Sequence, residues 1–217
     1  MAGNFSSNAT FDSITVSGSG NINAFLTKMS SGLNIGSLNL SLIMEGFYNL
    51  ANDNMRLKDT VRIYLRNSFP PYSIADISIS VIDPDTFTGP FTINNASNGN
   101  YYIQTKHRNS LENWSSQTVH YSYGGIINYN FTSSSSMAFG NNMTAVNNSP
   151  QRFAIYSGDV TQDGIIDASD LALIDNDATN FVKGYVPTEL TGDLIVDASD
   201  AAIVGNNAFE FVGLIRP

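Results

Sequence analysis

The sequence contains no cysteine, which excludes disulfide bonds and thiol chemistry. Charged residues are also scarce, at 13% of the 217 positions, and Ser, Thr and Asn fill many polar positions, as in many extracellular β-proteins. Since no run of about 18 apolar residues occurs, the sequence predicts no insertion into a membrane.

Basic residues are outnumbered, with ten Lys and Arg against 19 Asp and Glu, so the formal net charge is −9. This balance argues against nucleic acid or an anionic membrane surface as a partner. The acidity belongs almost wholly to residues 151–217, which hold 11 acidic and three basic side chains. Such a segment is either a solvated acidic surface or a region that cations neutralise.

Only two histidines, His107 and His120, are available for acid–base chemistry. Ser110 lies near His107, but no Gly-x-Ser-x-Gly sequence surrounds it, and the chain has neither a phosphate-binding glycine loop nor a zinc motif. We therefore expect His107 to be structural or merely exposed, and we expect no catalytic site and no enzymatic activity.

Residues 36–150 carry runs in which polar and apolar residues alternate, separated by turn signals such as Pro70-Pro71 and Asn98-Gly99. The runs are Leu38–Ile43, Val61–Arg66, Ile77–Val81, Tyr101–Lys106 and Ile127–Phe131. This period-two pattern predicts a mainly β chain, with an antiparallel, immunoglobulin-like β-sandwich of about seven strands over residues 36–150. We expect residues 132–149 to form a long loop.

Residues 1–35 form a separate segment rich in Ser, Asn, Thr and Gly. Two short alternating runs, residues 11–16 and 22–26, flank Ser17-Gly18-Ser19-Gly20 and predict a β-hairpin or strand extension. A lone hairpin cannot build a core, so it must pack on the next domain, on another chain or on a preceding partner. Strand addition to a neighbour's sheet is one such use.

The most informative segment is Asp159–Asp170. Acidic or hydroxyl side chains occupy positions 1, 3, 5, 9 and 12 of this segment, and Gly164 occupies position 6. A hard cation binds oxygens from alternate positions on one side of a curled loop, and a glycine allows the sharp turn. The spacing therefore predicts a calcium loop, followed at once by a helix.

This unit is duplicated, because Asp197–Asp200 repeats Asp167–Asp170 30 residues later. Apolar residues follow each copy at helical spacing and predict two helices that pack together. These residues are Leu171, Ile174, Ala178 and Phe181, and then Ala201, Val204, Ala208 and Phe211. The repeated carboxylates also suit helix N-termini without any metal, which is the alternative to a calcium site.

Residues 151–217 resemble the dockerin type I module, on Gly158–Leu171 and Leu190–Asp200. Modules of this family are duplicated calcium-binding loop–helix units, similar to EF-hands without the entering helix. The resemblance implies a first Ca²⁺ site at Asp159, Thr161, Asp163, the carbonyl of Ile165, Asp167 and Asp170. It implies a second site at Glu189, Thr191, Asp193, Ile195, Asp197 and Asp200.

The second repeat departs from the family pattern. Glu189 replaces the usual Asp at position 1, and Leu194 replaces the turn glycine. A leucine held at positive φ costs about 1 kcal/mol or more. We therefore expect calcium at the first site and weak or no binding at the second.

The combined layout is similar to C-terminal modules of large surface proteins of the Bacteroidetes–Ignavibacteria group, on residues 44–49, 59–66, 101–109 and 114–116. The sandwich in those modules resembles carboxypeptidase-regulatory or transthyretin-like domains, which are non-catalytic. The resemblance implies an extracellular or cell-surface location in a bacterium.

Two functions remain open. The first is a non-enzymatic, calcium-binding structural module of a surface assembly, fibre or adhesin, with other copies or other surface proteins as partners. The second is a recognition module on a secreted hydrolase, which binds a glycan or a cohesin. For a cohesin, the dockerin resemblance implies recognition through Ala168, Ser169, Ala198 and Ser199. The short apolar connection over residues 150–156 favours a tail that docks on its own sandwich.

Overall fold

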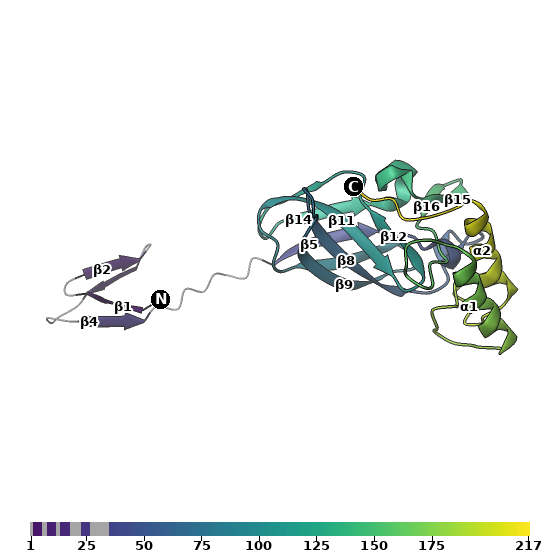
Figure 1. The fold of residues 1–217 in the computed structure, drawn as a ribbon. Helices are drawn as coiled ribbons and strands as arrows, with labels where there is room; N and C mark the ends of the chain where they lie inside the picture. Colours follow the sequence, from purple (N-terminus) through teal and green to yellow (C-terminus); the bar gives the residue numbers. More distant parts are fainter. Residues whose placement is uncertain (1, 6–7, 12–13, 18–22, 27–34) are drawn as a thin grey trace. The chain divides into compact units, whose positions relative to one another are not determined.

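The computed structural model describes residues 2–5, 8–11, 14–17, 23–26 and 35–217 (Figure 1). The chain forms two compact units, Met1–Asn34 and Ile35–Pro217. The second unit is mainly β, with several antiparallel sheets, and it ends in a segment with two helices, as the sequence predicts.

In the first unit, β1 (Ala2–Phe5) pairs with β4 (Asn23–Leu26), and β2 (Asn8–Phe11) pairs with β3 (Ile14–Ser17), both antiparallel. The predicted pairing of residues 11–16 with 22–26 is therefore wrong for the described residues, because β3 pairs with the strand before it. Residues 18–20 of the predicted turn lie outside the described residues.

Two sheets of the second unit share the main core. The first has the order β10 (Thr88–Ile93), β5 (Gly36–Ser41) and β14 (Ile126–Asn130). The second has the order β12 (Ser110–Trp114), β11 (Gly99–His107), β8 (Asp59–Asn67) and β9 (Ile74–Ile82), and β13 (Val119–Tyr121) also pairs with β11. Strand β14 runs parallel to β5, whereas the other pairs of these two sheets are antiparallel.

The core between these sheets follows the period-two pattern. On β8, Val61, Ile63 and Leu65 are at most 1% exposed, and they share the core with the fully buried Leu38 and Leu40 of β5. Burying one large apolar side chain stabilises a fold by roughly 1.5–3 kcal/mol. The alternation on β8 thus decides which face of the strand packs inwards.

Strand β9 also alternates, but its apolar residues lie on the outer face. Ile77, Ile79 and Val81 are 46%, 55% and 44% exposed. The polar face points inwards because Asp76 accepts the backbone N–H groups that follow β10, at 2.7–3.2 Å, and Ser78 accepts N–H of β10 itself at 3.0 Å. These bonds join the two sheets and leave an apolar row on the outside.

The predicted loop over residues 132–149 contains regular structure. It holds the 3-10 helices η2 (Phe131–Ser133), η3 (Ser135–Met137) and η4 (Phe139–Asn141), and strand β15 (Thr144–Asn148), which pairs with β16 (Gln151–Ala154). The remaining short elements are η1 (Glu45–Phe47), β6 (Tyr48–Asn49) and β7 (Asn54–Met55). The β15–β16 pair leads directly into the acidic tail.

Helices α1 (Ala168–Thr179) and α2 (Ala198–Phe209) lie together at one end of the sandwich (Figure 1). Asp167 and Asp197 are their N-caps, and each forms a capping box with the carboxylate three residues later. Ile174 and Val204 are fully buried, as the predicted apolar stripes require. No helix in the described part of the chain is long and apolar enough to cross a membrane.

The predicted stripes are wrong at their last positions. Phe181 and Phe211 are 83% and 93% exposed, because the helices end at residues 179 and 209. Both phenylalanines adopt φ of +55°, so the chain leaves the helical path before it reaches them.

Candidate metal centre and docking interface

Carboxylates that accept backbone N–H groups curl the first loop. Asp159 accepts N–H of Asp163 and Gly164 at 3.1 and 3.2 Å, and Asp170 accepts N–H of Thr161 at 2.9 Å. Gly164 adopts φ of +90°, a value that side chains disfavour. The sharp turn predicted at position 6 is therefore confirmed.

The second loop repeats this hydrogen-bond pattern. Glu189 takes the place of Asp159 and accepts N–H of Asp193 at 3.1 Å, while Asp200 accepts N–H of Thr191 at 3.0 Å. Leu194 adopts φ of +66°, so a branched side chain occupies the position of the turn glycine. This backbone conformation costs a leucine roughly 1–2 kcal/mol.

The predicted ligands fall into a buried group and a more exposed group. Asp159, Asp170, Glu189, Thr191 and Asp200 are buried. The other positions are exposed or half-buried, namely Thr161, Asp163, Ile165, Asp167, Asp193, Ile195 and Asp197. Among the described residues, no three metal-ligating acidic, His or Cys side chains converge on one point. In each loop the buried carboxylates accept hydrogen bonds from the backbone of the same loop.

The first loop brings acidic side chains together without a direct ion pair to a basic side chain in the described part of the chain. Burial raises the pKa of Asp159 to about 6, and the charges of Asp170 and Asp163 add to this effect. In the part of the chain that is described, none of these three carboxylates forms an ion pair with Lys or Arg. A buried carboxylate beside like charges is costly without a cation, and an all-oxygen donor set fits calcium.

The second loop, in contrast, receives a cation from the sandwich. Arg108, which follows β11, brings Nη2 within 3.5 Å of Glu189 Oε2 and Nε within 3.0 Å of Asp59 Oδ2. Its Nη1 donates to the carbonyl of Val186, and its guanidinium lies 4.3 Å from the centroid of the Tyr185 ring. The two repeats therefore differ, because in the described part of the chain only the second loop forms an ion pair with a basic side chain.

His107 joins this interface from its buried side. Its Nδ1 lies 2.8 Å from Ser110 Oγ, and its Nε2 lies 3.0 Å from Asp59 Oδ2. All three side chains are at most 3% exposed, so a substrate could not reach Ser110. His107 is therefore buried and hydrogen-bonded on both ring nitrogens, and it is not exposed.

Burial also sets the charge states of this group. Burial lowers the pKa of His107, so the imidazole is neutral near pH 7 and donates from Nε2 to Asp59. Burial alone would raise the pKa of Asp59, but hydrogen bonds from His107, Tyr185 and Arg108 hold it well below its usual value. Asp59 is thus an ionised acceptor at the centre of the interface.

Further contacts fix the tail on the sandwich. Asn109 Nδ2 donates to the carbonyls of Pro187 at 3.0 Å and Glu189 at 2.7 Å. Asn207 of α2 donates to Glu45 Oε2 at 2.7 Å. The backbones also approach closely, since a Cβ on Gly46 would lie 2.1 Å from the carbonyl oxygen of Leu190. The tail docks on its own sandwich, as the short connection predicts.

The sequence did not reveal Asp59, Arg108 or Asn109 as interface residues. The available signal was the polar run Lys106–Asn109 at the end of an apolar strand. Their partners lie 78–126 residues further along the chain, beyond the reach of local spacing.

No protein-family model and no curated protein matches this sequence. Among solved structures, the chain is similar to two interface mutants of the type II cohesin–X–dockerin complex from Acetivibrio cellulolyticus, each 16% identical. The C-terminal interface mutant gives a TM-score of 0.46 over 83% of this chain and 96% of that chain. The N-terminal interface mutant gives 0.42 over 79% and 93%. At these values the similarity assigns no function to this chain.

Proposed function

We propose that this chain is a non-enzymatic, extracellular, calcium-binding assembly module. In this proposal residues 36–150 form a transthyretin-like sandwich, and residues 151–217 form a dockerin-like tail that is locked onto it. The module is a building block of a bacterial surface assembly, fibre or adhesin, and it contacts other copies or other surface proteins. Residues 1–35 extend it towards a neighbour.

The observation that carries the calcium proposal is the unequal charge of the two loops. Asp159 is buried beside two like charges and has no basic partner among the described residues, whereas Glu189 is paired with Arg108. We therefore place one calcium ion in the first loop, held by oxygens of Asp159, Thr161, Asp163, Ile165, Asp167 and Asp170. In the second loop Arg108 provides the compensating charge.

Exposed aromatic residues on the tail support a role in protein assembly. Phe181, Phe209 and Phe211 follow or end the two helices and are 83%, 80% and 93% exposed. Phe209 and Phe211 lie close together in the sequence at the end of α2, whereas Phe181 follows α1. Large exposed apolar side chains can mark protein contacts where they form a patch. Because the tail is fixed to the sandwich, these side chains are presented on one rigid body.

A cohesin-type partner is the second candidate. Ala168, Ser169, Ala198 and Ser199, which the dockerin resemblance implicates in cohesin recognition, are all exposed at the N-terminal ends of α1 and α2. Small exposed residues at these positions leave room for a partner to approach both helices.

Calorimetric unfolding in calcium and in chelator tests the metal proposal. Calcium at a hundredfold excess over Kd should stabilise the folded chain by about 2.7 kcal/mol. Asp159→Asn should lose this stabilisation by calcium. Glu189→Gln should keep it, although its stability without calcium should be lower than that of the wild type. An unchanged melting temperature in the wild type would refute the calcium site, and a full increment in Asp159→Asn would place the ion elsewhere.

Light scattering tests the assembly proposal separately. Large particles in calcium that dissociate in chelator support a self-assembling module. A monomer of 23.5 kDa in both buffers rules out self-assembly. Capture of a cohesin-fold protein from the same organism would then favour the second candidate.

A further inference from the structure

The outer face of the five-stranded sheet gathers half of the chain's basic residues. Three adjoining hollows on this face share Lys106 in their walls. Their other basic residues are Arg62, Arg66, Arg108 and Arg216, so the face holds five of the ten in a chain of net charge −9. Like charges gather in this way at sites that bind a ligand of opposite sign.

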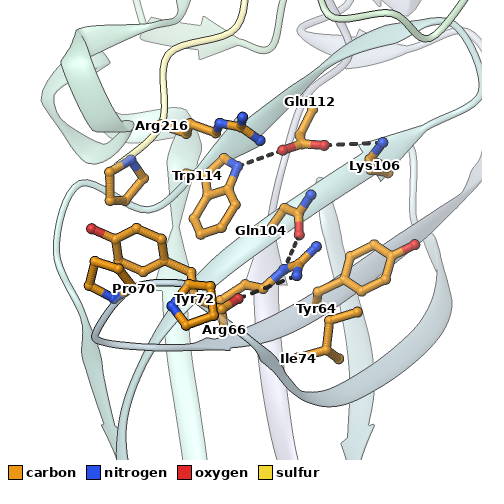
Figure 2. A pocket seen from close by; sticks show the side chains of 12 residues that line it. Tyr64, Arg66, Pro70, Tyr72, Ile74, Gln104, Lys106, Glu112, Trp114 and Arg216 are labelled. Carbon is orange, nitrogen blue, oxygen red and sulfur yellow. Dashed lines mark hydrogen bonds and ion pairs between the residues drawn. The ribbon is translucent and has the colours of Figure 1, made fainter.

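The largest of these three hollows has a volume of about 520 Å³, within the range of small-ligand sites. Figure 2 shows Arg66 at its centre, between Tyr64 and Tyr72, with Trp114 and Arg216 above. Strands β8, β11 and β12 supply half of its lining residues, so the hollow rests on the sheet.

Arg66 is held in place by neutral acceptors. Its Nε donates to Gln104 Oε1 at 2.5 Å, and its Nη1 donates to the carbonyl of Tyr72 at 3.3 Å. Its guanidinium also lies 5.2 Å from the ring centroid of Tyr64 and 5.6 Å from that of Trp114. These contacts orient the charge without cancelling it.

The single acidic side chain that lines the hollow is already engaged. Glu112 accepts Trp114 Nε1–H at 2.6 Å and pairs with Lys106 Nζ at 3.1 Å (Figure 2). Among the described residues, no carboxylate forms an ion pair with Arg66 or Arg216. The hollow therefore presents two guanidinium groups that have no ion-pair partner in the described part of the chain, and Arg216 also lines the adjoining hollow, which Asp159 and Asp163 line as well.

The walls between these charges are partly apolar. Ile74 is 46% exposed, and it lies beside the half-buried ring of Tyr64. Pro70 and Tyr72 form the opposite wall (Figure 2). Aromatic and aliphatic surfaces of this kind suit the carbon face of a rigid ring.

We propose that this hollow binds an acidic saccharide, in which a sugar ring lies against Tyr64 and Ile74 and its carboxylate pairs with Arg66 and Arg216. An extended peptide fits less well, because strand addition needs a sheet edge and this hollow lies on the face of the sheet. A long polyanion such as nucleic acid is repelled by the net charge of −9. A short saccharide with one charge per ring needs no sheet edge, and it carries less negative charge than a long polyanion.

Trp114 is the only tryptophan of the chain and lines the hollow, so its fluorescence reports binding there. The full chain would be titrated with a galacturonic acid trimer, with cellotriose as the neutral control and with a triglutamate peptide as the alternative anion. The acidic trimer should change the fluorescence at concentrations at least about tenfold below those that cellotriose or triglutamate require.

Arg66→Gln should weaken binding of the acidic trimer about tenfold or more. Arg216→Gln, at an exposed position where folding is not at risk, should also weaken it. Lys58→Gln removes an exposed charge outside the hollow and should leave the affinity unchanged. Equal binding of all three ligands, no binding of the trimer, or tighter binding of triglutamate would overturn the proposal.

The measurement is independent of the calcium proposal. Uronates bind calcium themselves, so the acidic trimer could in principle reach the first loop through a bridging ion. Trimer binding that needs calcium and persists in Arg66→Gln would overturn the proposal. Trimer binding in Asp159→Asn that is lost in Arg66→Gln would support it even if calcium does not bind.

Discussion

Arg108 and Glu189, which are 81 residues apart in the sequence, form an ion pair of 3.5 Å across the sandwich–tail interface. The same guanidinium pairs with Asp59 of the sandwich at 3.0 Å. One positive charge therefore serves two buried carboxylates, one on each side of the interface. Removing it leaves both acids without their partner.

We predict that Arg108→Leu lowers the free energy of unfolding by about 3–5 kcal/mol, the usual cost of breaking a buried ion pair. Arg152→Leu is the matched control, because its pair with Asp53 is 29% and 31% exposed. That change should cost about 0–1 kcal/mol. Denaturant unfolding measures both, and equal losses would contradict a special role for Arg108.

Gly46→Ala should separate the tail from the sandwich, because the new Cβ would lie 2.1 Å from the carbonyl oxygen of Leu190. We expect protease to cut the tail faster and the thermal transition to broaden or split. Gly205→Ala within α2 is the control, since nothing lies within 4 Å of its Cβ. It should stabilise the helix by about 0.5–1 kcal/mol. Intact docking in Gly46→Ala would show that the interface tolerates a shift.

Calcium affinity should depend on pH in the range set by Asp159. Burial and the nearby acidic charges raise the pKa of Asp159 to about 6, so below that pH a proton competes with the ion. Calorimetric titrations should show weaker binding as the pH falls from 7 to 5, together with proton release. A constant affinity over this range would exclude Asp159 as a ligand.

The buried histidine predicts a loss of stability in acid. Burial lowers the pKa of His107 from its ordinary 6.5, so below pH 6.5 the unfolded chain binds a proton that the folded chain excludes. The stability contribution is complete above pH 6.5 and is lost as the pH falls towards the folded pKa. His107→Gln should flatten the pH dependence of unfolding between pH 6.5 and 5. An unchanged slope would show that other groups control it.

Local patterns predicted the parts of this fold that depend on neighbouring residues. The period-two runs gave the buried face of β8, and the loop spacing gave the turn at Gly164 and both helix starts. These features need only hydrogen bonds and side-chain directions within about a dozen residues. The duplication at an offset of 30 residues extended the same reasoning to Leu194 and its positive φ.

Features that depend on distant partners were not predictable. Nothing near Ile77 and Ile79 shows that they face outwards, because the cause is the acceptance of β10 backbone groups by Asp76 and Ser78. Nothing near Arg108 shows that it meets Glu189. In both cases the outcome depends on which segments the fold brings together, which alternation alone does not specify.

At the interface between sandwich and tail, the sandwich provides side-chain donors and the tail provides mainly backbone carbonyl acceptors. Arg108 and Asn109 of the sandwich donate to the carbonyls of Val186, Pro187 and Glu189, and Gly46 lies against the carbonyl of Leu190. Every residue has a carbonyl, so most side chains between the helices can be replaced without loss of these contacts. Related chains should therefore keep the Arg-Asn pair and the glycine, while the segment they hold diverges in sequence outside Tyr185 and Glu189, whose side chains also contact the sandwich.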